Sequence, residues 1–123
     1  MARKASGRPT DTELEILRIV WANGPRSVRQ VHEELQQTKD VAYSTVLTQM
    51  QFMYKKGMLL RDETYHSHIY KAVKTQLQTE RSLVRSLIKH TFGGSARSLV
   101  LRALETENIS SEELERIDKL FED

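Results

Sequence analysis

The sequence predicts a mainly α-helical fold with a small β wing, in which a winged helix-turn-helix domain is followed by a helical dimerisation domain. Three features predict it. Residues 11–57 read as a helix, a short helix, a turn and a third helix that ends in lysines. Residues 58–73 read as two short extended segments around a polar turn, and residues 75–123 read as three further amphipathic helices. We therefore expect one domain over residues 1–74 and a second over residues 75–123.

The composition limits the classes of protein to which the chain can belong. Its 123 residues are 38% apolar and 29% charged, which suits a small domain with an appendage and a modest core. The absence of cysteine excludes disulfides and thiolate metal sites and fits a reducing compartment. No apolar run approaches the roughly 18 residues of a membrane span, and the basic N-terminus lacks the apolar region of a signal peptide. We expect a cytoplasmic protein without membrane insertion.

Charge is distributed unevenly along the chain, although the net charge is only +2. Residues 1–74 carry 12 Lys and Arg against 8 Asp and Glu, whereas residues 75–123 carry 7 against 9. A polyanion such as DNA would attract the first part and repel the second. The two parts are therefore expected to have different roles.

The first helix is predicted over Asp11 to about Ala22. Thr10 and Glu13 form a capping-box pair at its start, and a wide apolar stripe places it at the centre of the core. The stripe consists of Leu14, Leu17 and Trp21, with Ile16, Ile19 and Val20 beside them. A second capping-box pair, Ser27 and Gln30, opens a short helix. The inward residues of that helix are Val28, Val31 and Leu35.

The third predicted helix lies between Asp40 and Gly57, where the glycine is well placed to end it. Its inward stripe is Val46, Met50 and Met53. The opposite face has no acid and consists of Ser44, Leu47, Thr48, Gln51 and Lys55. The DNA major groove admits a helix with such a face, although the pattern also fits an ordinary solvated surface. Because a short helix and a turn precede it, this helix is the one that a helix-turn-helix places in the groove.

Two extended segments follow and form the predicted wing, residues 58–73. They are Met58–Glu63 and His68–Val73, with a polar tip at Thr64–Ser67 between them. The two faces of the second segment are Ile69, Lys71 and Val73, and His68, Tyr70 and Ala72. Two such segments directly after a helix-turn-helix predict a two-stranded wing.

Three more helices are expected, from Thr75 to about His90, from Ser95 to Glu105, and after Ser110, which forms a capping-box pair with Glu113. Their apolar residues are Leu77, Val84, Leu87, Ile88, Leu99, Val100, Ala103, Leu104, Leu114, Ile117, Leu120 and Phe121. Three short helices cannot form a stable core alone. The same segment of a second subunit would cover these residues, so we expect a homodimer. The alternative is that the helices fold back on the first domain.

No motif in the chain points to catalysis, so we do not expect an enzyme. There is no nucleophile motif, no Gly-rich phosphate loop and no convincing pair of carboxylates. His66 and His68 have a spacing that suits a metal, with Asp62 and Glu63 nearby. We expect no metal or other cofactor, and we expect these histidines to lie on or near the wing and to approach phosphate.

Three stretches of the chain resemble the BlaI/MecI penicillinase-repressor family. They are SVRQVHEELQ, VAYSTVLTQMQFMYKKGMLLR and FGGSARSLVLRAL, and the resemblance extends from the first helix to the final acidic helix. It implies a winged-helix DNA-binding domain, a helical dimerisation domain and repression by occupation of an inverted-repeat operator. It also implies a further partner, a membrane-linked sensor protease whose cut relieves repression.

Two departures from the family pattern concern induction. Copper-responsive members carry a cysteine-rich metal motif near the C-terminus, which this chain lacks. In the penicillinase members the cut falls at an Asn-Phe bond in the helix after the Gly-Gly turn, where this chain has Arg102 and Ala103. The family implies derepression by cleavage, and these two residues leave open whether the cut occurs.

We interpret the chain as a homodimeric repressor that binds a double-stranded DNA operator. The residues that would face base edges are Ser44, Leu47, Thr48 and Gln51, of which Leu47 suits a thymine methyl group and Gln51 suits adenine. The residues that would hold phosphates are Tyr43, Lys55, Lys56, Arg61 and His66. Two alternatives stay open: a winged-helix protein-interaction module that binds no DNA, and a metal-responsive sensor that uses His66 and His68.

Overall fold

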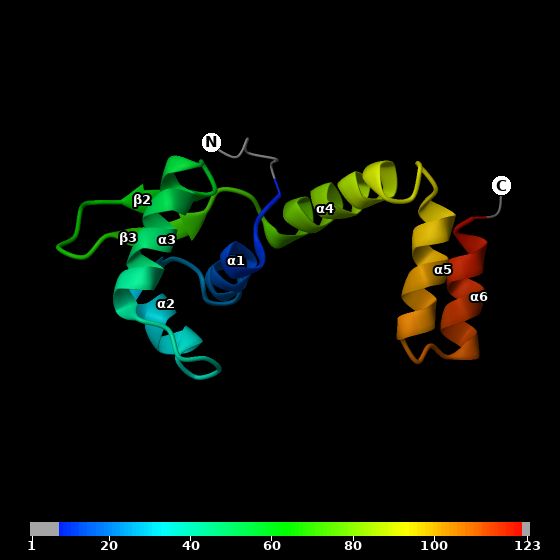
Figure 1. The fold of residues 1–123 in the computed structure, drawn as a ribbon, viewed down its shortest axis with the longest axis horizontal. Helices are drawn as coiled ribbons and strands as arrows, with labels where there is room; N and C mark the ends of the chain where they lie inside the picture. Colours follow the sequence, from blue (N-terminus) through cyan, green and yellow to red (C-terminus); the bar gives the residue numbers. More distant parts are fainter. Residues whose placement is uncertain (1–7, 122–123) are drawn as a thin grey trace. The chain divides into compact units, whose positions relative to one another are not determined.

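The computed structural model describes residues 8–121 and divides into two compact units, the first ending at Thr79 and the second beginning at Glu80. The first unit contains α1 (Asp11–Asn23), β1 (Arg26–Ser27), α2 (Val28–Leu35), α3 (Tyr43–Lys55), β2 (Leu59–Asp62) and β3 (Ile69–Ala72) (Figure 1). The remaining helices are α4 (Gln76–His90), which begins in the first unit, α5 (Ala96–Thr106) and α6 (Ser111–Lys119). The predicted class, mainly α with a small β sheet, is confirmed. Within residues 8–121 no helix is long and apolar enough to cross a membrane.

The three strands form one antiparallel sheet in the order β1-β3-β2. Strands β2 and β3 pair along their whole lengths, and the turn that joins them projects beyond α3 (Figure 1). The two residues of β1 pair with the other edge of β3. The predicted two-stranded wing was therefore incomplete, because two residues in front of a helix are too few to show a strand pattern.

The hydrophobic core is formed by α1, α2, α3 and the sheet. Its buried side chains are Ile16, Leu17, Val20, Val28, Val31, Leu35, Val46, Met50, Met53, Leu59 and Tyr70. The inward stripes predicted for α2 and α3 are confirmed in full. In α1 the buried centre of the stripe is Ile16, Leu17 and Val20, whereas Leu14 and Trp21 are half-buried. This core determines which side of α3 turns outward.

Capping at the helix starts agrees with the sequence in two of three predicted places. The capping boxes at α1 and α2 are confirmed, with both bonds formed in each. At α6 the Ser110 hydroxyl accepts a hydrogen bond from the Glu113 N–H at 3.2 Å. The return bond, from the Ser110 N–H to the Glu113 side chain, is absent among the bonds of residues 8–121. The predicted box is therefore half formed. An unpredicted box precedes α4, where Thr75 and Gln78 each accept the other's backbone N–H.

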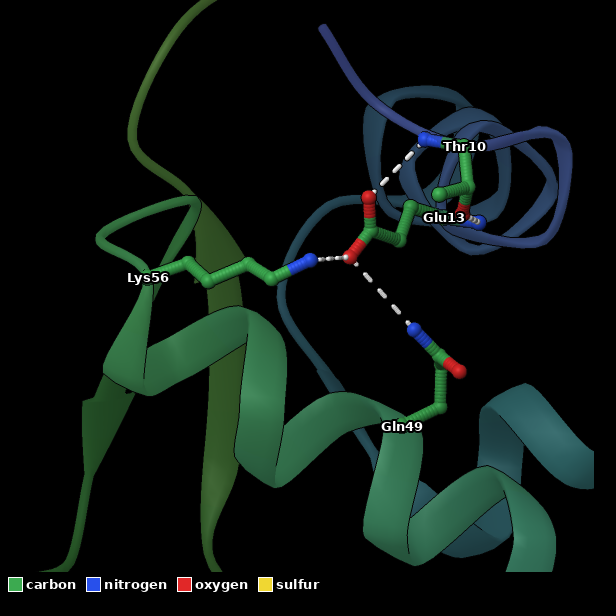
Figure 2. A network of polar contacts seen from close by, with 4 residues as sticks. All are labelled: Thr10, Glu13, Gln49 and Lys56. Carbon is green, nitrogen blue, oxygen red and sulfur yellow. Dashed lines mark hydrogen bonds and ion pairs between the residues drawn. The ribbon is translucent and has the colours of Figure 1, made fainter. Parts of the chain in front are cut away.

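One carboxylate lies among the apolar groups of the core. The side chain of Glu13 is only 1% exposed, and its two oxygens accept three bonds (Figure 2). Oε1 accepts the Thr10 N–H at 2.9 Å, and Oε2 accepts the Lys56 ammonium at 2.7 Å and the Gln49 amide at 3.5 Å. Gln49 belongs to α3 and Lys56 follows its last residue. The residue predicted only as a cap of α1 therefore also joins α1 to the second half of α3.

In the part of the second unit that the structure describes, residues 80–121, one chain forms no buried core. No side chain of α5 or α6 in the described residues is buried, and the single one in α4 is Thr79, where the first unit ends. Helices α5 and α6 lie side by side (Figure 1), and Arg97 stacks over the Phe121 ring at 5.7 Å. A hollow of about 420 Å³ at their connection is lined by Leu101, Leu104, Ile109 and Leu114, with Arg102, Glu105, Glu107 and Asn108. The homodimer and the fold-back alternative both stay predictions.

We expect Glu13→Gln to lower the free energy of unfolding by about 1–3 kcal/mol at neutral pH, because a buried amide cannot accept all the bonds of the carboxylate. Burial raises the pKa of Glu13, but bonds from Lys56 and Thr10 outweigh it and leave the pKa below its ordinary value of 4.5. The stabilisation is therefore complete above about pH 4.5 and is lost as the pH falls through the lower, folded-state pKa. Denaturant unfolding at several pH values, followed by the fluorescence of Trp21, measures both effects.

Glu15→Gln is the matched control for this experiment. Its carboxylate lies on the same helix but pairs with Lys39 at 2.9 Å at the surface. Exposed pairs contribute about 0–1 kcal/mol, so this change should alter stability little. Equal losses for the two variants, or an acid dependence that is as large in Glu13→Gln as in the wild type, would contradict the role given to Glu13.

Candidate nucleic-acid interface

The outward side of α3 is polar and carries no acid. Ser44, Thr48, Gln51 and Lys55 are exposed, and Leu47 is half-buried. Helical geometry places these five residues within one sector, opposite the buried stripe of α3. Their arrangement leaves a surface of hydroxyl, amide and methyl groups with one cation near its end. Such a surface can donate and accept hydrogen bonds without repelling an anion.

A hollow of about 370 Å³ separates this helix from the wing. Its lining comes from Ser27 of β1, from α2 (Val28 and Arg29), from α3 (Tyr43, Leu47 and Gln51) and from the wing (His66, Ser67, His68 and Tyr70). Four residues predicted to contact DNA therefore meet at one place: Tyr43, Leu47, Gln51 and His66. Histidine, arginine and hydroxyl groups around a concave surface are donors that suit phosphate oxygens.

Arg29 is the residue in this area that our sequence analysis missed. It lines the first hollow and also a neighbouring one of about 720 Å³, whose other lining residues are His32, Glu33, Gln36, Tyr43 and Ser67. The side chain is exposed, and the first turn of α2 contains no acid. A basic residue two positions after the Ser27 cap was a signal that could have been used, because the positive end of a helix favours anions.

His32 positions the start of α3. Its Nε2 lies 2.8 Å from the Val41 carbonyl oxygen, and because a carbonyl only accepts, this nitrogen carries the proton. The imidazole also meets the Tyr43 ring edge to face, with centroids 5.7 Å apart. The N-cap of α3 is Ala42, which makes no side-chain capping bond. His32, which had no expected role, therefore holds the segment that leads into α3.

Two cations expected to hold phosphate are paired within the protein. The Lys56 ammonium lies 2.7 Å from the buried carboxylate of Glu13. The Arg61 guanidinium lies 2.6 Å from Glu63 and 4.0 Å from the centroid of the Tyr54 ring. Lys55, in contrast, is exposed and turned to the outward side of α3.

His66 and His68 line the same hollow, and both are exposed. Among the described residues no group of three or more His, Asp or Glu side chains is arranged to hold a metal ion. The metal-responsive alternative therefore rests on the spacing of these two histidines alone.

The predicted dimer residues are at most half-buried in the single chain. Those exposed are Leu77, Val84, Leu114 and Leu120, and those half-buried are Leu87, Ile88, Leu99, Val100, Leu104, Ile117 and Phe121. The two residues at the candidate cleavage bond, Arg102 and Ala103, are both exposed, and Arg102 pairs with Glu105 at 3.2 Å.

Comparison with known proteins relates both units to one family. The family model for penicillinase repressors matches residues 9–123. The chain is 27% identical over 112 residues to the methicillin resistance regulatory protein MecI of Staphylococcus aureus strain N315, covering 91% of each chain. It is 24% identical over 114 residues to a penicillinase repressor of Bacillus licheniformis, covering 93% of this chain and 89% of that one. A shorter match, 38% identical over 64 residues, covers 51% of this chain and 46% of the transcriptional regulator BlaI of Mycobacterium tuberculosis.

We expect His32→Ala to loosen the first turn of α3. The N–H groups of Thr45 and Val46 bond to the Ala42 carbonyl, directly after the residue that His32 holds. Loss of one hydrogen bond of about 1 kcal/mol should speed their hydrogen exchange about fivefold. Exchange measured by mass spectrometry on the peptide that contains this turn tests the expectation.

Arg29→Ala serves as the control, because Arg29 lines the same hollow from the same helix without holding Val41. It should leave the exchange of α3 unchanged. Protection of α3 that is insensitive to His32→Ala would show that other contacts position this helix.

Proposed function

The chain belongs to the penicillinase repressor family, and from this membership we propose that it is a homodimeric transcriptional repressor that binds double-stranded DNA at an inverted-repeat operator. Two of its relatives are named a methicillin resistance regulatory protein and a penicillinase repressor. The observation that carries the proposal is the acid-free outward side of α3 next to the hollow that α3 shares with the wing. This combination offers base-reading groups and phosphate-binding groups on one continuous surface.

Helix α3 is the proposed recognition helix. Its short polar side chains, Ser44 and Thr48, leave room for close approach to base edges in the major groove. Gln51 can form two hydrogen bonds with adenine, and the methyl groups of Leu47 can contact a thymine methyl. These four residues would distinguish one DNA sequence from another.

Most of the proposed phosphate contacts line the same hollow. Three of them line it: Tyr43 of α3, His66 of the wing and Arg29 of α2, which we add to the set predicted from sequence. The fourth is Lys55, which is exposed one turn beyond Gln51 on α3. Lys56 is left out because its ammonium neutralises a buried carboxylate. Phosphate contacts fix the register of a protein on DNA and contribute no sequence preference.

The second unit is the proposed dimer contact. In support, the apolar side chains of α5 and α6 stay partly exposed in one chain, and two half-sites of an operator require two recognition helices. Cleavage within α5 by a membrane-linked sensor protease is the proposed route to derepression. A break in this helix would remove part of the dimer contact, and with it the gain from binding two half-sites together.

We expect Gln51→Ala to reduce discrimination between operator and random DNA by about 1–3 kcal/mol, as for the loss of a bidentate base contact. Lys55→Ala should instead weaken binding to both kinds of DNA similarly and make the salt dependence shallower. Titrations of both variants with a duplex recovered by selection from the source genome, and with a shuffled duplex, measure these quantities over a range of salt concentrations.

The same titrations test the proposed function as a whole. Affinity of the wild-type protein for the selected duplex should fall steeply as salt rises, because phosphate neutralisation releases counterions. A protein-interaction module would show no such DNA binding. An unchanged specificity ratio in Gln51→Ala would mean that α3 does not read bases through this residue.

Cutting α5 should release the DNA although no residue there is proposed to touch it. A protease site engineered between Arg102 and Ala103 allows the cut to be made at will, and both residues are exposed. If the two subunits separate, operator affinity should fall by roughly 10²–10⁴, the gain expected from linking two half-sites. Mass and affinity are measured before and after cutting, with the uncut variant as control. A cut protein that stays dimeric and retains its affinity would exclude α5 as the switch.

A further inference from the structure

Arg61 has protein partners in two elements of the first unit and in the turn that follows β2. It lies on β2, directly opposite Tyr70 of β3. Its guanidinium stacks over the Tyr54 ring near the end of α3, 4.0 Å from the ring centroid. Its Nε and one terminal nitrogen both donate to Oε2 of Glu63, at 2.7 and 2.6 Å. Hydrogen-bonding interactions with the side chains of Tyr70 and Glu63 raise the pKa of Arg61.

We propose that Arg61 is a positioning residue that holds the wing against the end of α3, with Glu63 as its counter-ion, and that it does not contact DNA phosphate. This inference rests on the proposed DNA-binding function and replaces the phosphate role expected from sequence. The wing turn that begins at Glu63 carries His66 to the hollow beside α3. The fit of the wing to DNA therefore depends on how β2 is fixed to α3.

The chemistry of the contacts requires arginine rather than any cation. A planar guanidinium can stack on an aromatic ring and at the same time donate parallel bonds in its own plane. A lysine ammonium group is a compact point charge, which can lie over a ring or pair with a carboxylate. It lacks the parallel N–H donors and the flat face that are needed to do both at once. Phosphate, in contrast, is bound by lysine as well as by arginine. Arg61→Lys therefore separates the two roles.

The charge balance of the ion pair also distinguishes a positioning residue from a phosphate contact. Glu63 neutralises Arg61 within the protein, so the pair adds no net charge to the DNA-facing surface. Each phosphate contact contributes about 0.9 to the slope of log affinity against log salt concentration. Removing both partners, in Arg61→Met with Glu63→Gln, keeps the net charge and should leave this slope unchanged. It should nevertheless lower affinity, because the wing is no longer held.

The test uses all 123 residues of the chain and a duplex recovered by binding selection from a randomised DNA pool, with a shuffled duplex beside it. We expect Arg61→Lys to lower affinity for the selected duplex about tenfold, and the double variant at least as much, both with the wild-type salt slope. Lys55→Ala is the matched control on the neighbouring helix, and its slope should become shallower. Thermal unfolding of each variant is measured alongside.

Three results would overturn the proposal. Wild-type affinity in Arg61→Lys would show that a point charge suffices. A slope that is shallower by about 0.9 for each bound subunit in the double variant would identify Arg61 as a phosphate contact. Unfolding of both variants at the working temperature would make Arg61 a residue of general stability. Failure of the proposed function is a separate outcome, because the wild-type protein itself would then show no salt-dependent binding to either duplex.

Discussion

The geometry of the first unit depends on one buried carboxylate, that of Glu13. A charge removed from water is tolerated only where other groups pair with it and satisfy its hydrogen bonds. The partners of Glu13 come from both sides of the helix-turn-helix: the backbone of Thr10 before α1, and Gln49 and Lys56 in and after α3. The apolar core is non-directional and would permit small rotations of α3. The bonds to Glu13 are directional, so they restrict the small rotations of α3 that the core alone would permit.

This constraint also explains why neighbouring cations have different roles. Lys55 and Lys56 are adjacent in the sequence, but a helix turns by about 100° per residue, so they leave α3 in different directions. Lys56 reaches the buried carboxylate, and Lys55 remains on the outward side. A corresponding difference separates Arg61, which is paired with Glu63, from the exposed Arg29. The number of cations on the surface therefore overstates how many can meet phosphate.

The sequence predicted the features that depend on local chemistry and periodicity. Both N-terminal capping boxes and the inward stripes of α2 and α3 follow from residues a few positions apart, and these predictions were confirmed. It did not predict contacts between residues far apart in the chain, such as Glu13 with Lys56, or His32 with Val41. A lone histidine or glutamate shows no pattern from which its partner can be inferred. Of the candidate interface, the face of α3 was predicted. Arg29 was missed although its place after the Ser27 cap was a signal, and the pairing of Arg61 showed no sequence pattern.

In the proposed repressor, the second unit would control DNA affinity without contacting DNA itself. Its helices are 9 to 15 residues long, a length at which an isolated helix is marginal in water, and α5 and α6 bury no side chain alone. In the proposed dimer, folding of this unit and association of the subunits would be coupled. The folded helices would form the contact surface, and the second subunit would supply the apolar contacts that these helices lack in one chain. Residues 75–79 carry no charge, so the excess of acids belongs to the second unit whether it begins at residue 75 or at Glu80. Those acids repel phosphate, so in the proposed repressor the unit would contribute to operator binding by linking two recognition helices.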